Sequence, residues 1–235
     1  MPDSLRRQYP RGSLTPLGEG FNPSPKKANV VRAYIIGNGK SLAVEQLNKI
    51  VGQPSYACNR INLDYPKTEW RPTVYTHVES LAPDLPFIQE NVDAGITCWI
   101  AEHYTTIEDK PNVRRIKECH HHLLNFDSPE LQDEWHFPQP CSFGGSVNWM
   151  MQRAVLDGFD ELILLGCDLE YRDGKASHFD KAYEHGGEQP AFYASRNALY
   201  GHIHALNYIR RRRLNVKVYN ATRGGLLEIW TRIYV

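Results

Sequence analysis

Apolar and polar positions follow two alternating patterns from Val30 to the end of the chain. Short apolar runs, typical of buried β-strands, alternate with stretches in which apolar residues recur every three or four positions, as on one face of an α-helix. The runs that predict strands are 30–36, 55–58, 73–78, 96–100, 121–125, 161–167 and 216–220. The stretches that predict helices are 42–51, 84–92, 145–157 and 191–212.

This alternation predicts an α/β protein with a Rossmann-like, mostly parallel sheet and helices on both faces. We expect a single domain over residues 29–235, within which 102–141 is irregular, rich in His, Pro and charge, and interpreted as a lid or small insertion. Residues 1–28 are proline-rich without apolar periodicity and predict an extended or disordered leader. Ligands of such folds bind beyond the carboxyl ends of the strands, at a topological switch point.

Composition and net charge indicate a globular protein and limit the kinds of binding partner to expect. The 235 residues are 41% hydrophobic and 23% charged, which is typical of a soluble globular protein. Basic and acidic residues number 27 each, so the net charge does not favour nucleic acid as a partner. The one basic run, Arg210–Arg213, is interpreted as the solvated end of a helix, where cations complement the helix dipole.

Cysteine usage and the absence of targeting patterns indicate the compartment. The five cysteines are odd in number, widely spaced and without a CxxC pair, which favours free thiols in a reducing compartment. We find no signal-peptide pattern and no apolar run approaching the roughly 18 residues of a membrane span. These features predict a soluble, cytoplasmic protein and leave its oligomeric state open, a homo-oligomer included.

The turn Gly37-Asn38-Gly39-Lys40-Ser41 follows the first predicted strand. Glycines admit a ligand close to the backbone, and a helix N-terminus offers N–H groups to an anion, so the turn is a candidate phosphate site. Ser41 could equally be a structural helix N-cap. An ATP-binding P-loop is disfavoured because that motif needs a glycine five positions before Gly39, where Tyr34 stands.

Two further segments carry small or amide side chains at the ends of predicted elements. Asn59, Arg60 and Asn62 follow the second strand and could contact a base or ribose, or stabilise a turn. The segment 142–146, with Gly144 and Gly145, opens a predicted helix and could receive a phosphate, unless Ser146 only caps that helix.

The apolar run that ends at Asp168 is followed by a polar cluster. Its carboxylates could hold Mg²⁺ or Mn²⁺ through oxygen ligands. Alternatively, Asp168 orients polar groups while Tyr171 and His178 act on a leaving phosphate, or the aspartate is a structural turn. The cluster comprises Asp168, Glu170, Tyr171, Asp173, His178 and Asp180.

Two other polar segments are weaker candidates. Arg223, in the glycine-containing segment 219–225, could pair with a phosphate or carboxylate or lie in a surface turn. The tract His120–His122 is not interpreted as a zinc site, because adjacent histidines on a strand point to opposite faces.

Taken in order, these pieces resemble the bacterial sialyltransferases of glycosyltransferase family 42 and the related proteins grouped with 6-hydroxymethylpterin pyrophosphokinases. The resemblance covers about Tyr34 to Asn220. The matching segments are IIGNGKSL, YACNRINL, SFGGSVNWMMQRAVLDGFDELILLGCDLEY and VKVYNAT.

The resemblance to the sialyltransferases implies a Rossmann-like nucleotide fold, CMP-sialic acid as donor, and no metal or other cofactor. It places Asn38 and Ser41 in the turn that contacts the phosphate and ribose of CMP, and Tyr171 where a tyrosine stabilises the departing phosphate. The nucleotide-binding residues that we predict are Gly37, Asn38, Gly39, Lys40, Ser41, Asn59, Gly144, Gly145 and Asp168.

The chain departs from the family pattern at three places. Lys40 replaces a proline and adds positive charge beside the expected phosphate, and His178 stands where a second tyrosine is expected. The family's catalytic histidine has no clear counterpart. Arg196 or Asn197 falls near its place, with His185 before and His202 after.

Three functions follow as hypotheses. The first is a glycosyltransferase that uses a nucleotide-sugar donor and an unidentified acceptor, with His178 or His185 as general base and Tyr171 on the leaving phosphate. The second is a Mg²⁺-dependent pyrophosphokinase acting on a pterin-like alcohol, with metal bound by Asp168, Glu170 and Asp180. The third is a non-catalytic nucleotide-binding module.

Overall fold

A computed structural model describes residues 30–78, 84–116, 145–171, 177–183, 191–212 and 214–235. The predicted leader and the predicted strand 121–125 lie outside these residues. The strands are β1 (Arg32–Ile36), β2 (Ser55–Cys58), β3 (Val74–His77), β4 (Thr97–Ala101), β5 (Val113–Ile116), β6 (Glu161–Leu165), β7 (Lys217–Asn220) and β8 (Thr231–Arg232). The helices are α1 (Val44–Lys49), α2 (Leu85–Asp93), α3 (Gly145–Leu156) and α4 (Ala191–Arg211), with 3₁₀ segments η2 (Ile61–Lys67) and η6 (Lys181–Tyr183).

The described strands form one parallel sheet in the order β5-β4-β3-β2-β1-β6-β7-β8. Parallel neighbours need long crossovers, and α1, α2, α3 and α4 supply most of them. The predicted α/β, Rossmann-like fold is therefore confirmed.

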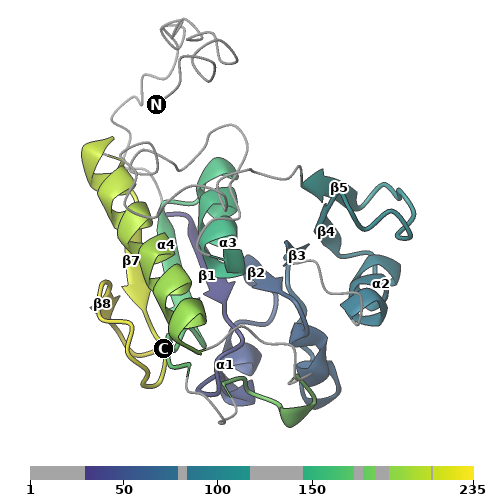
Figure 1. Ribbon diagram of the computed structural model, residues 1–235, viewed down its shortest axis with the longest axis horizontal. Coiled ribbons are helices and arrows are strands. Elements are labelled where there is room, and N and C mark those ends of the chain that lie inside the picture. The colour runs from purple at the N-terminus through teal and green to yellow at the C-terminus, as the bar shows by residue number, and fades with distance from the viewer. Residues whose placement is uncertain (1–29, 79–83, 117–144, 172–176, 184–190, 213) are drawn as a thin grey trace, which may run out of the picture.

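Side chains of the central strands alternate between two apolar clusters, one on each face of the sheet. From β1, Ala33 and Ile35 join the cluster that contains residues of α3 and α4, and Figure 1 shows these two helices side by side over the sheet. Tyr34 and Ile36 join the other cluster, with residues of α1 and α2. Because both faces of β1 are buried, its residues form a nearly continuous apolar run in the sequence.

The strand order reverses direction at β1. The chain moves from β1 to β2 on one side, and the later strand β6 pairs with β1 on the other side, with Ile36 opposite Leu165. Because the connections leave β1 and β6 in opposite directions, their carboxyl ends mark the topological switch point of the sheet. The turns after Ile36 and Leu165 therefore frame the candidate site.

The structure adds two strands that the apolar pattern did not predict. β5 lies inside 102–141, the predicted lid or insertion, and extends one edge of the sheet, while residues 117–141 lie outside the described part of the chain. β8 extends the other edge with two residues. Both are edge strands with exposed or partly exposed charged residues, a composition common at sheet edges.

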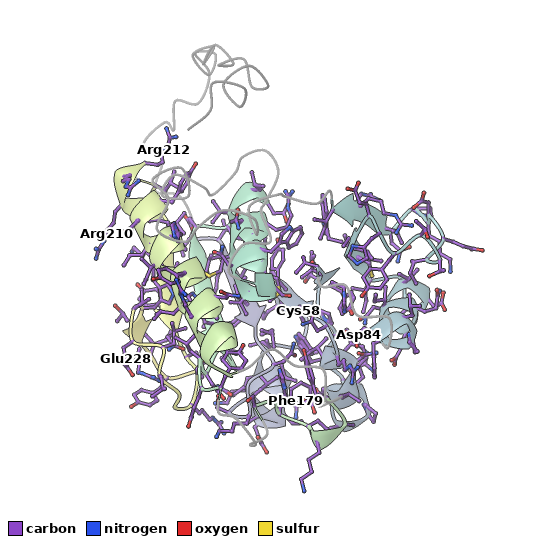
Figure 2. All side chains as sticks on the ribbon, viewed as in Figure 1. Cys58, Asp84, Phe179, Arg210, Arg212 and Glu228 are labelled. Atoms are coloured by element: carbon purple, nitrogen blue, oxygen red, sulfur yellow. The ribbon has the colours of Figure 1, made fainter. Side chains whose placement is uncertain are left out.

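Three further sequence features can be placed on the fold: the cysteines, the helices and the basic run. Cys58, Cys98 and Cys167 are buried and form no disulfide, whereas the other two cysteines lie outside the described residues. Among the described helices, none has the length and apolarity needed to cross a bilayer. Figure 2 shows Arg210 and Arg212 at the opposite end of the molecule from Phe179, so the basic run at the end of α4 is remote from the switch point.

Candidate functional site at the switch point

The turns after β1 and β6 touch backbone to backbone. The N–H of Gly37 donates to the carbonyl oxygen of Leu165 at 2.8 Å, and that of Gly39 to Gly166 at 2.8 Å. A Cβ atom on Gly37 would lie 2.5 Å from the Gly166 carbonyl oxygen, and one on Gly39 would lie 2.6 Å from Cγ of Asp168. The two glycines are thus needed for this contact between segments, whether or not a ligand also approaches them.

Ser41 binds Asp168 and does not cap the following helix. Its N–H donates to Oδ2 of Asp168 at 2.9 Å, and its hydroxyl donates to Oδ1. The helix α1 begins at Val44 with Ala43 at the N-cap position and no side-chain cap, so the N-cap role considered for Ser41 is wrong. Asp168 is buried, and the serine supplies two of the donors that a buried carboxylate needs.

Lys40, which departs from the family pattern, lies near an acidic partner. Its Nζ is 3.8 Å from Oε1 of Glu170, and its side chain is about half exposed, at 46%. The positive charge that the sequence places beside an expected phosphate is therefore shared with a carboxylate of the β6 turn. An exposed pair of this kind contributes little to stability.

The segment Ser177–Tyr183, which we call the strap, runs across the β1 turn. His178 pairs with Gly39 in an antiparallel bridge, and the N–H of Phe179 donates to the carbonyl oxygen of Asn38 at 3.1 Å. Nδ2 of Asn38 donates to the hydroxyl of Tyr183 at 3.2 Å and to the carbonyl oxygen of Cys58 at 3.1 Å. The structure thereby brings Asn38 and His178, two predicted site residues, to the same place.

The His178 ring is stacked on Tyr183. Their centroids are 3.8 Å apart and their planes meet at 14°. Phe179 packs edge-on against the same tyrosine at 6.1 Å, and Lys67 on η2 pairs with Asp180 at 3.1 Å from the outside. The strap is therefore ordered by aromatic packing on one side and by an ion pair on the other.

After β2, Asn59 adopts a left-handed backbone with a φ of 54°, a conformation in which asparagine is enriched. Its carbonyl oxygen accepts a hydrogen bond from the hydroxyl of Tyr75 at 2.7 Å. The side chain is buried next to the turn after β1, at the carboxyl edge where the sequence placed it. Asn62 donates to the carbonyl oxygen of Phe87 and to Glu90, so it serves the packing of α2.

Arg60 enters a buried ionic network. Its Nε donates to Oδ1 of Asp84 at 2.7 Å, and Nε2 of His77 lies 2.8 Å from Oδ2 of the same carboxylate. Burial alone would raise the pKa of Asp84, but the hydrogen bonds from His77 and Arg60 outweigh burial and hold that pKa below its ordinary value. Sequence analysis offered Arg60 as a base or ribose contact, whereas the structure turns it toward Asp84.

The remaining predicted residues are less central or not described. Tyr171 is partly buried and follows the β6 turn, and Gly145 is the first residue of α3 with a φ of 84°. Gly144 and His185 lie outside the described residues. His202 is a core residue whose Nδ1 accepts from Trp230 Nε1 at 3.1 Å, and burial lowers its pKa to about 4.

The glycine segment after β7 has a structural role. The N–H of Leu226 donates to the carbonyl oxygen of Asp168 at 2.7 Å, and Oγ1 of Thr222 accepts from the N–H of Cys167 at 3.0 Å. Arg223 itself is exposed. Burial raises the pKa of the Cys167 thiol to about 12, so this thiol stays protonated at neutral pH and is no nucleophile.

The carboxylates that a metal would need have other partners. Asp168 is bound by Ser41, Glu170 faces Lys40, and Asp180 accepts from Lys67 and from the N–H of Ala182. Across the described parts of the chain, no group of three His, Cys, Asp or Glu side chains is arranged to hold a metal ion.

Sequence reasoning missed Tyr183, Asp84 and His77. Tyr183 has no motif around it, and its contacts with Asn38 span 145 positions of the chain. Asp84 occupies the N-cap position of α2, which is common for aspartate, but it makes no cap bond because its oxygens face Arg60 and His77. The sequence held one signal for a buried acid: Arg60 directly follows a predicted buried strand and Asn59, and a buried arginine needs an acidic partner.

Comparisons with known proteins identify similar folds only. No known protein family matches the sequence at a significant level, and neither does any curated protein. Among solved structures, a Maf glycosyltransferase of Magnetospirillum magneticum AMB-1 is similar with a TM-score of 0.51 and 18% identity over 87% of this chain. The chain spans only 33% of that protein's length.

The sialyltransferase CstII of Campylobacter jejuni, in complex with the substrate analogue cytidine-5'-monophosphate, is similar over nearly its whole length. The TM-score is 0.51 and the identity 14%, over 88% of this chain and 86% of that one. The same enzyme with CMP-3FNeuAc matches with a TM-score of 0.50 and 14% identity over 87% and 86%. This chain thus has the fold of these proteins.

Proposed function

We propose that the protein is a glycosyltransferase that moves a sugar from a nucleotide-activated donor, of the CMP-sialic acid class, to an acceptor hydroxyl. The observation that carries the proposal is the antiparallel bridge between Gly39 and His178, which brings the backbone of this histidine to the turn at the switch point, with its ring stacked on Tyr183. Ligands of open α/β sheets bind at this position. The fold similarity to CstII in complex with CMP gives the donor class its support.

The β1 turn would bind the nucleotide. Nδ2 of Asn38 is committed to Cys58 and Tyr183, while its Oδ1 has no hydrogen-bond partner among the described residues. An amide oxygen accepts hydrogen bonds, so it suits a ribose hydroxyl or a base amino group better than a phosphate oxygen. Lys40, exposed at the rim, would move from Glu170 to the donor's phosphate.

His178 would act as general base on the acceptor hydroxyl, and Tyr171 would donate a hydrogen bond to the leaving phosphate. Transfer breaks the bond between the anomeric carbon and the phosphate oxygen, and forms one from that carbon to the acceptor oxygen, whose proton passes to His178. A histidine suits this task because its ordinary pKa lies near neutral pH. The turn's N–H donors are largely occupied, so Tyr171 and Lys40 would neutralise the leaving group.

Donor consumption tests this function. CMP-, UDP- and GDP-sugars are incubated with the protein, and released nucleotide is measured. We expect release from a CMP-sugar and a loss of about 10²–10⁴-fold in His178→Ala, the usual worth of a general base. His103→Ala is the matched control, because His103 also packs against a neighbouring tyrosine, with centroids 4.5 Å apart, but follows β4.

Two results would contradict the proposal. If no donor is consumed under any condition, the protein is not a transferase of this class. If a nucleotide binds tightly without turnover, and His178→Ala binds it equally well, the protein is a non-catalytic nucleotide-binding module.

A further inference from the structure

We propose that Arg60 is a positioning residue that fixes the strap, and through Tyr183 sets the orientation of His178 and Asn38. The structural part of this inference concerns contacts within the protein. Its consequence for turnover rests on the proposed glycosyltransferase function.

The guanidinium of Arg60 binds Asp84 on one side and the main chain of the strap on the other. Nε donates to Asp84 at 2.7 Å, while Nη1 donates to the carbonyl oxygens of Ala182 at 3.1 Å and Tyr183 at 3.0 Å. The Arg60 side chain is 6% exposed and that of Asp84 is 3% exposed. Because a buried charge is costly without a partner, the pair and the two carbonyl oxygens belong to one arrangement.

The anchoring side of this arrangement lies on regular elements. Asp84 stands at the start of α2, and its second carboxylate oxygen meets Nε2 of His77, the last residue of β3, at 2.8 Å. The His77 ring is fully buried and packs edge-on against Tyr104 at 5.2 Å. Arg60 therefore connects the strap to α2 and β3, through Asp84 and His77.

The strap side carries the proposed functional groups. Arg60 holds the main chain at Tyr183, and the ring of this tyrosine stacks on His178 at 3.8 Å while its hydroxyl accepts from Nδ2 of Asn38. A shift of the Tyr183 backbone would move both contacts together. Arg60 is thus placed to act on the site through Tyr183 and not by touching a ligand.

The strap's ion pair with η2 is weaker than its bonds with Arg60. The pair of Lys67 and Asp180 is exposed, with side chains 47% and 28% accessible, and such pairs are screened by solvent. Hydrogen bonds from a charged, buried donor are worth more, because water does not compete for the acceptor. Arg60 is accordingly the stronger of these two ties.

Arginine suits this task better than lysine. Its planar fork directs Nε and Nη1 to different acceptors at once, whereas an ammonium group on a flexible stem does not fix two directions. Arg60→Lys keeps the charge that Asp84 needs but loses the geometry. We therefore expect it to retain the fold and only part of the strap's order, while Arg60→Met loses that order.

The test is the ring-proton NMR signal of His178, assigned by its disappearance in His178→Gln. Stacking on Tyr183 at 3.8 Å shifts the signal upfield through the ring current. We expect Arg60→Met to lose this shift and Arg60→Lys to keep part of it. Arg153→Met is the matched control, since Arg153 also pairs with an aspartate, Asp157, and lies over an aromatic ring, at 5.1 Å from Trp99, away from the strap.

A second readout separates positioning from stability. Where the wild type consumes a donor, Arg60→Lys should lower kcat by about tenfold or more with a smaller change in KM, because displacing a catalytic group by about 1 Å can cost up to roughly 10²-fold. Arg153→Met should leave kcat unchanged.

The outcomes are distinct for the two proposals. If Arg60→Met folds and its His178 signal is unchanged, the inference is overturned. If Arg60→Met does not fold, an unchanged His178 signal in Arg60→Lys overturns it. A signal that moves as expected in a protein that consumes no donor supports the positioning role and contradicts only the glycosyltransferase proposal.

Discussion

At the scale of single residues, polar groups tie the turn after β1 to the turn after β6. A phosphate-binding turn would instead keep these groups available for the ligand. The Ser41 N–H and hydroxyl are both bound by Asp168, and Lys40 faces Glu170. Anion binding at such a turn depends on donors that are not already engaged. This agrees with the proposal that Asn38 contacts the ribose or base and not the phosphate.

The bond between Ser41 and Asp168 makes a stability prediction. Ser41→Ala should lower the free energy of unfolding by about 1–3 kcal/mol, because it deprives a buried carboxylate of a donor. Urea unfolding of both proteins measures the difference.

Ser55→Ala is the control for this prediction. The Ser55 hydroxyl is buried at the start of β2 and has no hydrogen-bond partner among the described residues. Removing an unsatisfied hydroxyl should change stability by less than about 0.5 kcal/mol or increase it. Equal losses in the two variants would contradict the assignment of the Ser41 hydroxyl to Asp168.

Local residue patterns predicted the glycine turn but not its partners. Gly37 and Gly39 were identified because a strand must leave the sheet through residues that permit close approach, and Tyr34 argued against a P-loop. That these glycines meet Gly166 and Asp168 depends on the pairing of β1 with β6, which joins residues 129 positions apart at Arg32 and Glu161. No local pattern encodes that pairing.

At the scale of elements, β3, α2 and the strap are linked by one buried carboxylate. Asp84 accepts from Arg60 and faces His77, and its depressed pKa means that the folded state favours the ionised form. A carboxyl group of this kind adds stability above its unfolded pKa, ordinarily 3.8, and loses that contribution as pH falls through the lower folded pKa.

Asp84→Asn should therefore be destabilised most at neutral pH. We expect a loss of about 3–5 kcal/mol at pH 6, because the variant leaves Arg60 buried without its counter-charge. The gap between wild type and variant should narrow below pH 3.8, because the unfolded wild-type chain then takes up a proton at Asp84 while the folded carboxyl group, with its lower pKa, is still ionised. Urea titrations at pH 6 and pH 3 measure both values.

Asp93→Asn provides the contrast. Asp93 also has a depressed pKa, through its hydrogen bond with Lys110, but the pair is exposed and should respond to salt. The effect of Asp93→Asn should therefore vanish in about 0.5 M NaCl while that of Asp84→Asn persists. A constant gap between wild type and Asp84→Asn from pH 6 to pH 3 would contradict the charged network.

The elements themselves were predictable where their apolar faces are large. β1, β6 and α3 were identified nearly to their ends because each buries an almost continuous or periodic apolar set. β5 and β8 were missed because an edge strand needs few apolar residues, and β5 carries two arginines at its centre. The predicted start of α1 at residue 42 was wrong by two residues, because Ser41 serves Asp168 and not the helix.

At the scale of the whole molecule, the fold places the candidate site at the one point where the parallel sheet changes winding direction. The β1 turn, the β6 turn and the strap converge there, from positions 37–41, 166–171 and 177–183. The alternation of strands and helices sufficed to predict a mostly parallel sheet with a switch point, but not that β1 and β6 meet there. The strap's path across the turn could not be predicted, since it follows from Arg60, Tyr183 and Asn38 meeting only in the folded chain.

The most direct test of the central claim, that this switch point binds the nucleotide of a sugar donor, is the change in thermal midpoint with nucleotides. CMP at about 100 times its Kd should stabilise the protein by about 2.7 kcal/mol, which corresponds to a rise of roughly 5–10 °C for a chain of this size. The rise should be lost in Asn38→Ala and kept in Asn112→Ala, whose amide also donates two hydrogen bonds within the protein, to the carbonyl oxygens of Val92 and Ile96, but near the β4–β5 edge. A midpoint that no cytidine, uridine or guanosine nucleotide raises, or an equal rise in Asn38→Ala, would contradict the account.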